Sequence, residues 1–351
     1  MKNKPLSTVV ADRLQQAARS LGAADPLPFV RPLLDRTFYL PEGDARYAAS
    51  TLTPGAAPFE PSFSEKEPRL LRFSIEPLGP ESSPVDRKLE ATREMRRLVG
   101  PLFGQEALRW FDQRSEDWRG MGARTGLHYG AFFGTAYDGD GLHSSKVYYE
   151  MTPSQLEALP PMLRTLVRNA ILTMPELVPV FTTIACRRHQ GSQRITFYHR
   201  GPLRLADLSD LMARLNMEHQ LPSVMQIVGL ALGGRFELPD QSTLLAIADT
   251  NEGPELKLEV LLTMIPDLPP SFLELLSLGL AERPRELNAL RAWLQAFTPE
   301  EHGWPGRFSV LSVRVTPTTP ARVSLYLRPV EFEIKQRLDD AAAQRNGMAL
   351  A

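Results

Sequence analysis

Five pairs of strand-like segments, with helical stretches between successive pairs, constrain the fold of this chain most strongly. Each pair is joined by a short connection rich in turn-forming residues. Examples are Asp138 to Gly141 in the second pair and Asn251 to Gly253 in the fourth. Such connections between extended segments predict β-hairpins. The five predicted hairpins cover residues 58–77, 127–151, 178–200, 242–264 and 307–329.

The stretches between the hairpins have apolar residues at helical spacing, which predicts helices. The first, residues 5–22, is expected to begin with Ser7 as its N-cap and to end at Gly22. We expect further helices within residues 85–103, 152–174, 204–232 and 271–297, and a polar helical tail after residue 330.

Ten antiparallel strands with this connectivity favour a closed barrel with the helices outside, because closure leaves no unpaired edge strand. The predicted fold class is therefore α+β, a ten-stranded antiparallel barrel built from five hairpins, with helices outside and one strand face lining a lumen. We expect one domain over residues 1–351. It comprises an N-terminal helix and loop (1–57), the barrel (58–330) and a C-terminal helical tail (331–351).

Polar side chains recur on one face of several predicted strands. Lys146, Tyr148 and Glu150 alternate with Val147 and Tyr149, so the first three share a face. A solvated outer face would explain any single strand of this kind. The repetition favours instead a shared interior that is lined by aromatic residues and binds an anion. The other stripes are Arg72, Ser74 and Glu76; Arg194, Thr196, Tyr198 and Arg200; and Arg322, Ser324, Tyr326 and Arg328.

Composition excludes several classes of function. The 351 residues include 40 Lys and Arg against 41 Asp and Glu, a net charge of -1, so no global field recruits nucleic acid or a membrane surface. The single cysteine, Cys186, excludes an internal disulfide, and we expect it to be buried. With no apolar run of 18 residues and no signal-like N-terminus, we expect a soluble cytoplasmic protein, a monomer or homodimer.

The histidines show no metal-binding spacing, and no DDxxD motif is present. We therefore expect no bound metal and no obligatory magnesium.

Several short motifs, in this order on successive hairpins, resemble the aromatic prenyltransferases of the αββα barrel type. The resemblance covers about residues 58–330 and is closest to the indole group typified by the dimethylallyltryptophan synthases. It implies that this chain transfers a dimethylallyl group from dimethylallyl diphosphate to tryptophan or an indole-containing secondary metabolite, releasing diphosphate. The motifs are FEPSF, RFSIEPLG with Asp86 downstream, KVYYE, RITFY, LKLEV and SLYLRP.

The resemblance implies that the barrel consists of five αββα repeats with the active site in the lumen. It also implies roles for individual residues and two small-molecule partners, the prenyl diphosphate and the aromatic acceptor, with no cofactor. Glu60 would accept a hydrogen bond from the indole nitrogen, although a surface carboxylate in this Pro-flanked segment is an equal alternative. The implied diphosphate ligands are Arg72, Lys146, Arg194 and Lys257, and the tyrosines that shield the allyl cation are Tyr148, Tyr198 and Tyr326.

The chain departs from the family pattern at two strand positions. Thr196 stands where the family usually has a basic residue, and Glu259 where it usually has a tyrosine. Phe133 lies roughly where a family lysine is expected, so no match identifies the base that removes the ring proton. Two alternatives remain open at this point: a prenyltransferase for a phenolic or peptide acceptor, and a non-catalytic barrel that holds a hydrophobic ligand.

Overall fold

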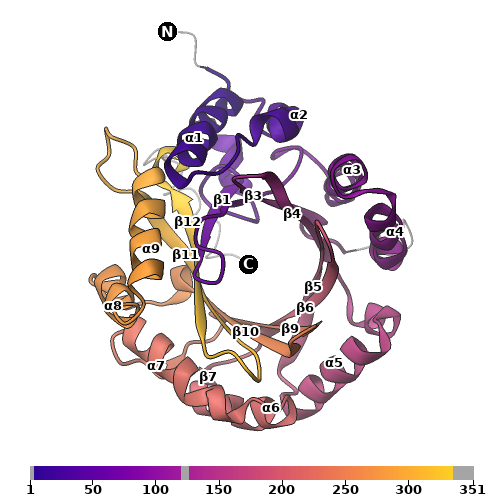
Figure 1. Cartoon of the computed structure of the whole chain (residues 1–351), viewed down its shortest axis with the longest axis vertical. Coiled ribbons are helices and arrows are strands. Elements are labelled where there is room, and N and C mark those ends of the chain that lie inside the picture. Colours follow the sequence, from indigo (N-terminus) through magenta and orange to yellow (C-terminus); the bar gives the residue numbers. More distant parts are fainter. Residues whose placement is uncertain (1–3, 120–125, 335–351) are drawn as a thin grey trace, which may run out of the picture.

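The structure, a computed structural model, describes residues 4–119 and 126–334. Its centre is a closed antiparallel barrel of ten strands, ringed by helices (Figure 1). The barrel strands are β1 (Phe59–Ser64), β2 (Leu71–Ile75), β3 (Ala131–Asp138), β4 (Gly141–Glu150), β5 (Leu177–Arg187), β6 (Gly191–His199), β9 (Thr243–Thr250), β10 (Gly253–Leu261), β11 (Gly306–Val315) and β12 (Arg322–Pro329).

Neighbours around the barrel follow the order of the chain, and β12 pairs with β1 to close it. This confirms the predicted α+β barrel of five consecutive hairpins. Figure 1, viewed down the barrel, places the helices outside the strands. The helices are α1 (Leu6–Leu21), α2 (Leu27–Thr37), α3 (Pro84–Phe103), α4 (Gln105–Arg119), α5 (Pro161–Thr173), α6 (Ser209–Arg214), α7 (Leu221–Ala231), α8 (Phe272–Gly279) and α9 (Pro284–Ala296).

The strands present one apolar and one polar face, as alternation requires. On β2, Leu71, Phe73 and Ile75 are buried. The Phe73 ring stacks on Tyr137 of the neighbouring β3, with centroids 6.3 Å apart. The helices cover this outer apolar surface, and α3 packs on β3 and β4 through buried residues such as Met95 and Leu98. The apolar core therefore lies between barrel and helices, which leaves the lumen to polar side chains.

The N-terminal helix ends as predicted but begins differently. Gly22 adopts a left-handed conformation (φ 69°), and its N–H donates to the carbonyl of Ala18. The prediction that Ser7 caps the helix is wrong, because Ser7 lies inside α1 and is buried. The amide of Ser7 donates instead to the carbonyl of Phe38, and that of Leu6 to Leu40. Main chain from the next segment thus satisfies the donors that a side-chain cap would serve.

The outer members of the polar stripes hold the chain together at the far end of the barrel from the hairpin turns. Glu150 accepts hydrogen bonds from the backbone amides of residues 128–130. Glu76 accepts them from the Ser50 hydroxyl and the amides of residues 51 and 52. Arg328 pairs with Glu333 at 3.1 Å. The members nearer the hairpin turns, such as Arg72, Lys146 and Arg194, are the ones that meet in the lumen.

Two expectations concern segments outside the barrel. Of the predicted C-terminal helical tail, residues 330–332 form a 3-10 turn, and residues 335–351 lie outside the described part of the chain. Among the described helices, none is both long and apolar enough to cross a membrane. The pair β7 (Leu203–Arg204) and β8 (Glu237–Leu238) forms a separate two-stranded sheet that the sequence did not predict.

Candidate active site

A cavity of about 350 Å³ opens at the end of the barrel where the hairpin turns lie. It continues inward into a narrow chamber of about 30 Å³. The two spaces share part of their lining, so the chamber is the inner end of one continuous site. The shared lining residues are Arg72, Lys146, Thr183, Arg194 and Arg314.

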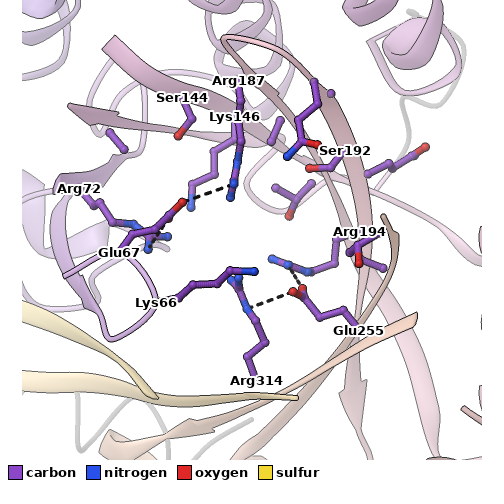
Figure 2. A pocket seen from close by; sticks show the side chains of 18 of the residues that line it. Lys66, Glu67, Arg72, Ser144, Lys146, Arg187, Ser192, Arg194, Glu255 and Arg314 are labelled. Atoms are coloured by element: carbon purple, nitrogen blue, oxygen red, sulfur yellow. Dashed lines mark hydrogen bonds and ion pairs between the residues drawn. The ribbon is translucent and has the colours of Figure 1, made fainter. Parts of the chain in front are cut away.

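Cationic side chains from five strands line the inner chamber. Figure 2 looks into the outer cavity and labels those that the two spaces share, Arg72, Lys146, Arg194 and Arg314. The structure brings together all four predicted diphosphate ligands and adds a fifth cation, Arg314 of β11. Sequence reasoning missed Arg314, although it alternates with Ser312 opposite the buried Val313 and Val315. The five cations are Arg72, Lys146, Arg194, Lys257 and Arg314, against one lining carboxylate, Glu259.

Glu255, a second residue that the sequence reasoning missed, ties two of these arginines together. It forms ion pairs with Arg194 and, at 3.4 Å, with Arg314 (Figure 2). Burial of Glu255 would raise its pKa, but the charges of the two arginines outweigh burial and lower the pKa to about 2. Glu255 therefore stays ionised and holds both guanidinium groups in the lumen wall.

Glu67, on the turn after β1, anchors the mouth of the cavity. Its carboxylate lies 3.6 Å from the Nη1 atom of Arg72 and 3.4 Å from that of Arg187. Burial would raise the pKa of Glu67, but the surrounding cations lower it. This turn is thereby connected to β2 and β5 at the entrance.

Lys146 has no counter-ion in the described part of the chain, since no carboxylate there lies within ion-pair distance. Burial, together with the charges of Arg72 and Lys257, holds its pKa well below the usual value. The Nη1 atom of Arg72 and the Nε atom of Arg194 are also buried without a hydrogen-bond partner. Buried donors that lack a hydrogen-bond partner among the described residues, around a cationic cavity, indicate a site suited to an anionic ligand.

Aromatic side chains form the wall beside these cations. The Nζ atom of Lys146 lies 4.9 Å from the centroid of the Tyr148 ring, and Phe181 meets Tyr148 edge to face with centroids 5.6 Å apart. Lys257 donates a 2.9 Å hydrogen bond to the hydroxyl of Tyr326. All three rings line the chamber, so two of the three predicted tyrosines are in place.

Tyr198 is not brought to the chamber. It shares a strand face with Arg194 but lies four residues further along β6, about 13 Å at the usual rise per residue. Its hydroxyl instead lies 3.4 Å from the carboxylate of Asp240 near the end of the barrel. The strand face that Tyr198 shares with Arg194 predicts the direction of its side chain but not its position along the barrel axis.

Glu60 lies beside the chamber and is only 6% exposed, so the interpretation as a surface carboxylate is wrong. Its Oε1 atom accepts a 2.6 Å hydrogen bond from the Ser309 hydroxyl. Burial raises the pKa of Glu60 to about 7; the charge of Glu259 acts in the same direction, while Ser309 and the two nearby lysines oppose it. The carboxyl group is therefore balanced between its two protonation states near neutral pH.

The two positions that depart from the family pattern both face the chamber. Thr196 lines it without charge, and Glu259 forms an ion pair with Lys257. Phe133 points the other way, into the core between barrel and helices, so it does not occupy a position in the chamber. Cys186 is buried, as expected. In the residues described, no cluster of three or more His, Cys, Asp or Glu side chains is placed to hold a metal ion.

Gly134 of β3 leaves room for the Lys146 side chain, which crosses directly over it. A Cβ atom at position 134 would lie 2.6 Å from Cε of Lys146 and 3.2 Å from the Ser74 hydroxyl oxygen. Such contacts are closer than van der Waals packing allows, so any side chain here would displace the ammonium group.

We predict that Gly134→Ala weakens binding of inorganic pyrophosphate about tenfold, because a charge-assisted contact contributes roughly 1.5–3 kcal/mol. Isothermal titration calorimetry measures this, with Lys146→Ala as the reference for full loss of the ammonium group. The control is Gly139→Ala in the β3–β4 turn, where a Cβ would meet only a carbonyl oxygen at 3.4 Å. Equal affinities for Gly134→Ala and the unmodified protein would contradict the assigned role of Lys146.

A second prediction follows from the raised pKa of Glu60. A carboxyl group with a higher pKa in the folded than in the unfolded state stabilises the fold at low pH and loses that contribution as pH rises. The unfolding free energy should therefore fall by up to about 3 kcal/mol between pH 4.5 and pH 7, and Glu60→Gln should abolish this part of the decline. Urea denaturation across this range, with the exposed Glu301→Gln as control, tests it; parallel profiles for both variants would refute it.

This chain matches known proteins in its fold but not in its sequence. No protein-family model and no curated protein sequence matches the chain. Solved structures do match. The 5-dimethylallyltryptophan synthase from Streptomyces coelicolor aligns with a TM-score of 0.67 and 16% identity over 96% of this chain and 100% of that one.

Two further structures show the same likeness. The 6-dimethylallyltryptophan synthase from Micromonospora olivasterospora, solved in complex with DMASPP and Trp, gives a TM-score of 0.68 with 16% identity over 95% of this chain and 100% of its own. AnaPT from Neosartorya fischeri gives 0.68 with 13% identity over 93% and 94%. The chain therefore has the ten-stranded αββα barrel fold of the prenyltransferases, which confirms at the level of the fold the resemblance seen in its sequence motifs.

Proposed function

We propose that this protein is an aromatic prenyltransferase that moves a dimethylallyl group from dimethylallyl diphosphate to an indole-bearing acceptor. The observation that carries the proposal is the convergence of five cations from five strands beside the rings of Tyr148 and Tyr326. One part of the site suits a diphosphate and the adjacent part suits an allyl cation. The two functions meet inside one enclosed chamber.

The cations serve the leaving group. As the carbon–oxygen bond of the donor breaks, negative charge develops on the diphosphate, and preplaced guanidinium and ammonium groups stabilise it. The Nη1 atom of Arg72 and the Nε atom of Arg194, which have no hydrogen-bond partner among the described residues, would donate to the diphosphate. Lys146, which is buried among like charges, would gain a counter-ion when the donor binds.

The aromatic wall serves the allyl fragment. Ring faces attract a cation through their quadrupoles without attacking it as good nucleophiles would, and an enclosed wall excludes water. We assign this role to Tyr148 and Tyr326, with Phe181 in addition. Tyr198, which lies away from the chamber, is not assigned to it.

Glu60 serves the acceptor. A buried carboxylate that accepts the indole N–H would make the ring more electron-rich as it attacks. Its raised pKa, about 7, makes it a stronger hydrogen-bond acceptor than an exposed glutamate. Support for tryptophan as acceptor comes from a structure of the same fold that was solved with Trp and DMASPP.

We predict that the protein consumes dimethylallyl diphosphate in the presence of EDTA, because basic side chains supply the charge that magnesium provides in carboxylate-rich synthases.

Mass spectrometry of mixtures with tryptophan, indole compounds, phenols and Trp- or Tyr-containing peptides identifies the prenylated acceptor. Prenylation of phenols alone would redirect the proposal to a phenolic acceptor. Tight donor binding without any product would support a non-catalytic barrel, and activity restored only by magnesium would contradict the metal-independent mechanism.

The assignment of Glu60 makes a separate prediction. Glu60→Gln should slow prenylation of an indole acceptor by about 10² or more, the usual range for such a contribution. Donor affinity should change little. N-methylated acceptor, which has no N–H to donate, should lose much less from the same substitution. Steady-state rates for both proteins with both acceptors form a cycle, and additive losses would show that Glu60 and the indole nitrogen do not meet.

A further inference from the structure

The proposed reaction leaves one proton without a recipient. When the allyl carbon bonds to the aromatic ring, the attacked carbon still carries its hydrogen, and the ring regains aromaticity only when a base removes that proton. Glu60 is assigned to the ring nitrogen. Burial raises the pKa of Tyr148 far above neutral, so its phenol stays protonated and cannot accept the proton.

Glu259 is the carboxylate that the chamber itself contains. It projects from β10 two residues after Lys257 and is 8% exposed. The same chamber is lined by Tyr148, Phe181 and Tyr326, the rings assigned to the allyl fragment. Its charge contributes to the raised pKa of Glu60, so the two carboxyl groups lie close enough to interact although they come from different strands.

The ion pair with Lys257 orients Glu259. Lys257 donates to its Oε1 atom and, at 2.9 Å, to the hydroxyl of Tyr326, so the lysine connects β10 with β12, which lies on the far side of β11. Among the described residues, only Oε1 of Glu259 accepts a hydrogen bond, and Oε2 has no protein partner. One oxygen is therefore held in place while the other remains able to take a proton.

We propose that Glu259 is the base that removes the ring proton after prenyl transfer, an inference that rests on the proposed function. The donor's carbon–oxygen bond breaks with its electron pair leaving on the diphosphate. A ring π pair forms the new carbon–carbon bond. The carbon–hydrogen pair then returns to the ring, and the proton passes to Oε2 of Glu259 and from there to solvent when products leave. No oxidant or further reactant is required.

The test uses Glu259→Gln, which keeps the shape and removes the basic oxygen. In the unmodified enzyme, rapid deprotonation should give no primary isotope effect with an acceptor that is perdeuterated on its aromatic ring. In Glu259→Gln, deprotonation should limit the rate. Turnover should fall by about 10² or more, a primary deuterium effect should appear, and Glu259→Asp should recover part of the rate.

A second measurement does not require product from the variant. If ring prenylation reverses because the proton is not removed, ¹⁸O placed in the bridging position of the donor should scramble into the non-bridging positions. The ratio of scrambling to product formation should rise in Glu259→Gln. Pyrophosphate titration and circular dichroism show whether the variant folds and retains its anion site.

The matched control is Glu255→Gln, which removes the other carboxylate among the same cations. It should change the affinity for pyrophosphate without producing an isotope effect. A folded Glu259→Gln enzyme with a reduced rate but neither isotope effect nor extra scrambling, or with an unchanged rate, would overturn the role of Glu259. Inactivity of the unmodified enzyme toward every acceptor would instead count against the proposed function itself.

Discussion

The interaction on which the rest of the structure depends is the mutual repulsion of buried cations in the lumen. Like charges removed from water are unfavourable unless carboxylates or a ligand offset them. Glu255 offsets Arg194 and Arg314, and Glu259 offsets Lys257. Lys146 is left without a described counter-ion, and its burial together with the nearby cations lowers its pKa. The barrel thus holds an electrostatic field ready for an anion rather than forming one when the anion arrives.

The buried cations on the inner face of the barrel are unfavourable, so the barrel must be stabilised by packing on its outer face. The outward faces of the strands provide it, because side chains such as Phe59, Phe63 and Phe73 are buried almost completely. Phe63 packs against Trp293 of α9, and Phe59 against Phe332 beyond β12. Burial of each such side chain contributes roughly 1.5–3 kcal/mol. Alternation along each strand therefore separates a stabilising outer face from a functional inner one.

That alternation is also why so much could be predicted from sequence. Period-two patterns and turn residues specify the hairpins, and the direction in which Arg72, Lys146, Arg194 and Lys257 point follows from them. Depth along the barrel axis does not follow, because it depends on the stagger between strands, and Tyr198 was misplaced for that reason.

Contacts between segments that are distant in the sequence could not be predicted either. The start of α1 depends on carbonyl groups more than 30 residues away, at Phe38 and Leu40, so Ser7 looked like a cap. Arg314 and Glu255 are polar residues on strands whose neighbours only the fold reveals. Their pairing needs β6, β10 and β11 to be in register, and no local pattern encodes it.

Closure of the barrel by the first and last strands has a consequence for how this protein is made. Ser62 of β1 pairs with Tyr326 of β12, residues near opposite ends of the described chain. During synthesis β1 is made long before β12. One edge of β1 therefore stays unpaired until the final hairpin is complete. The anion site is finished at the same moment, since Arg314 and Tyr326 belong to that hairpin. If the proposed function holds, a diphosphate ligand would bind only the closed form and draw late folding intermediates toward it.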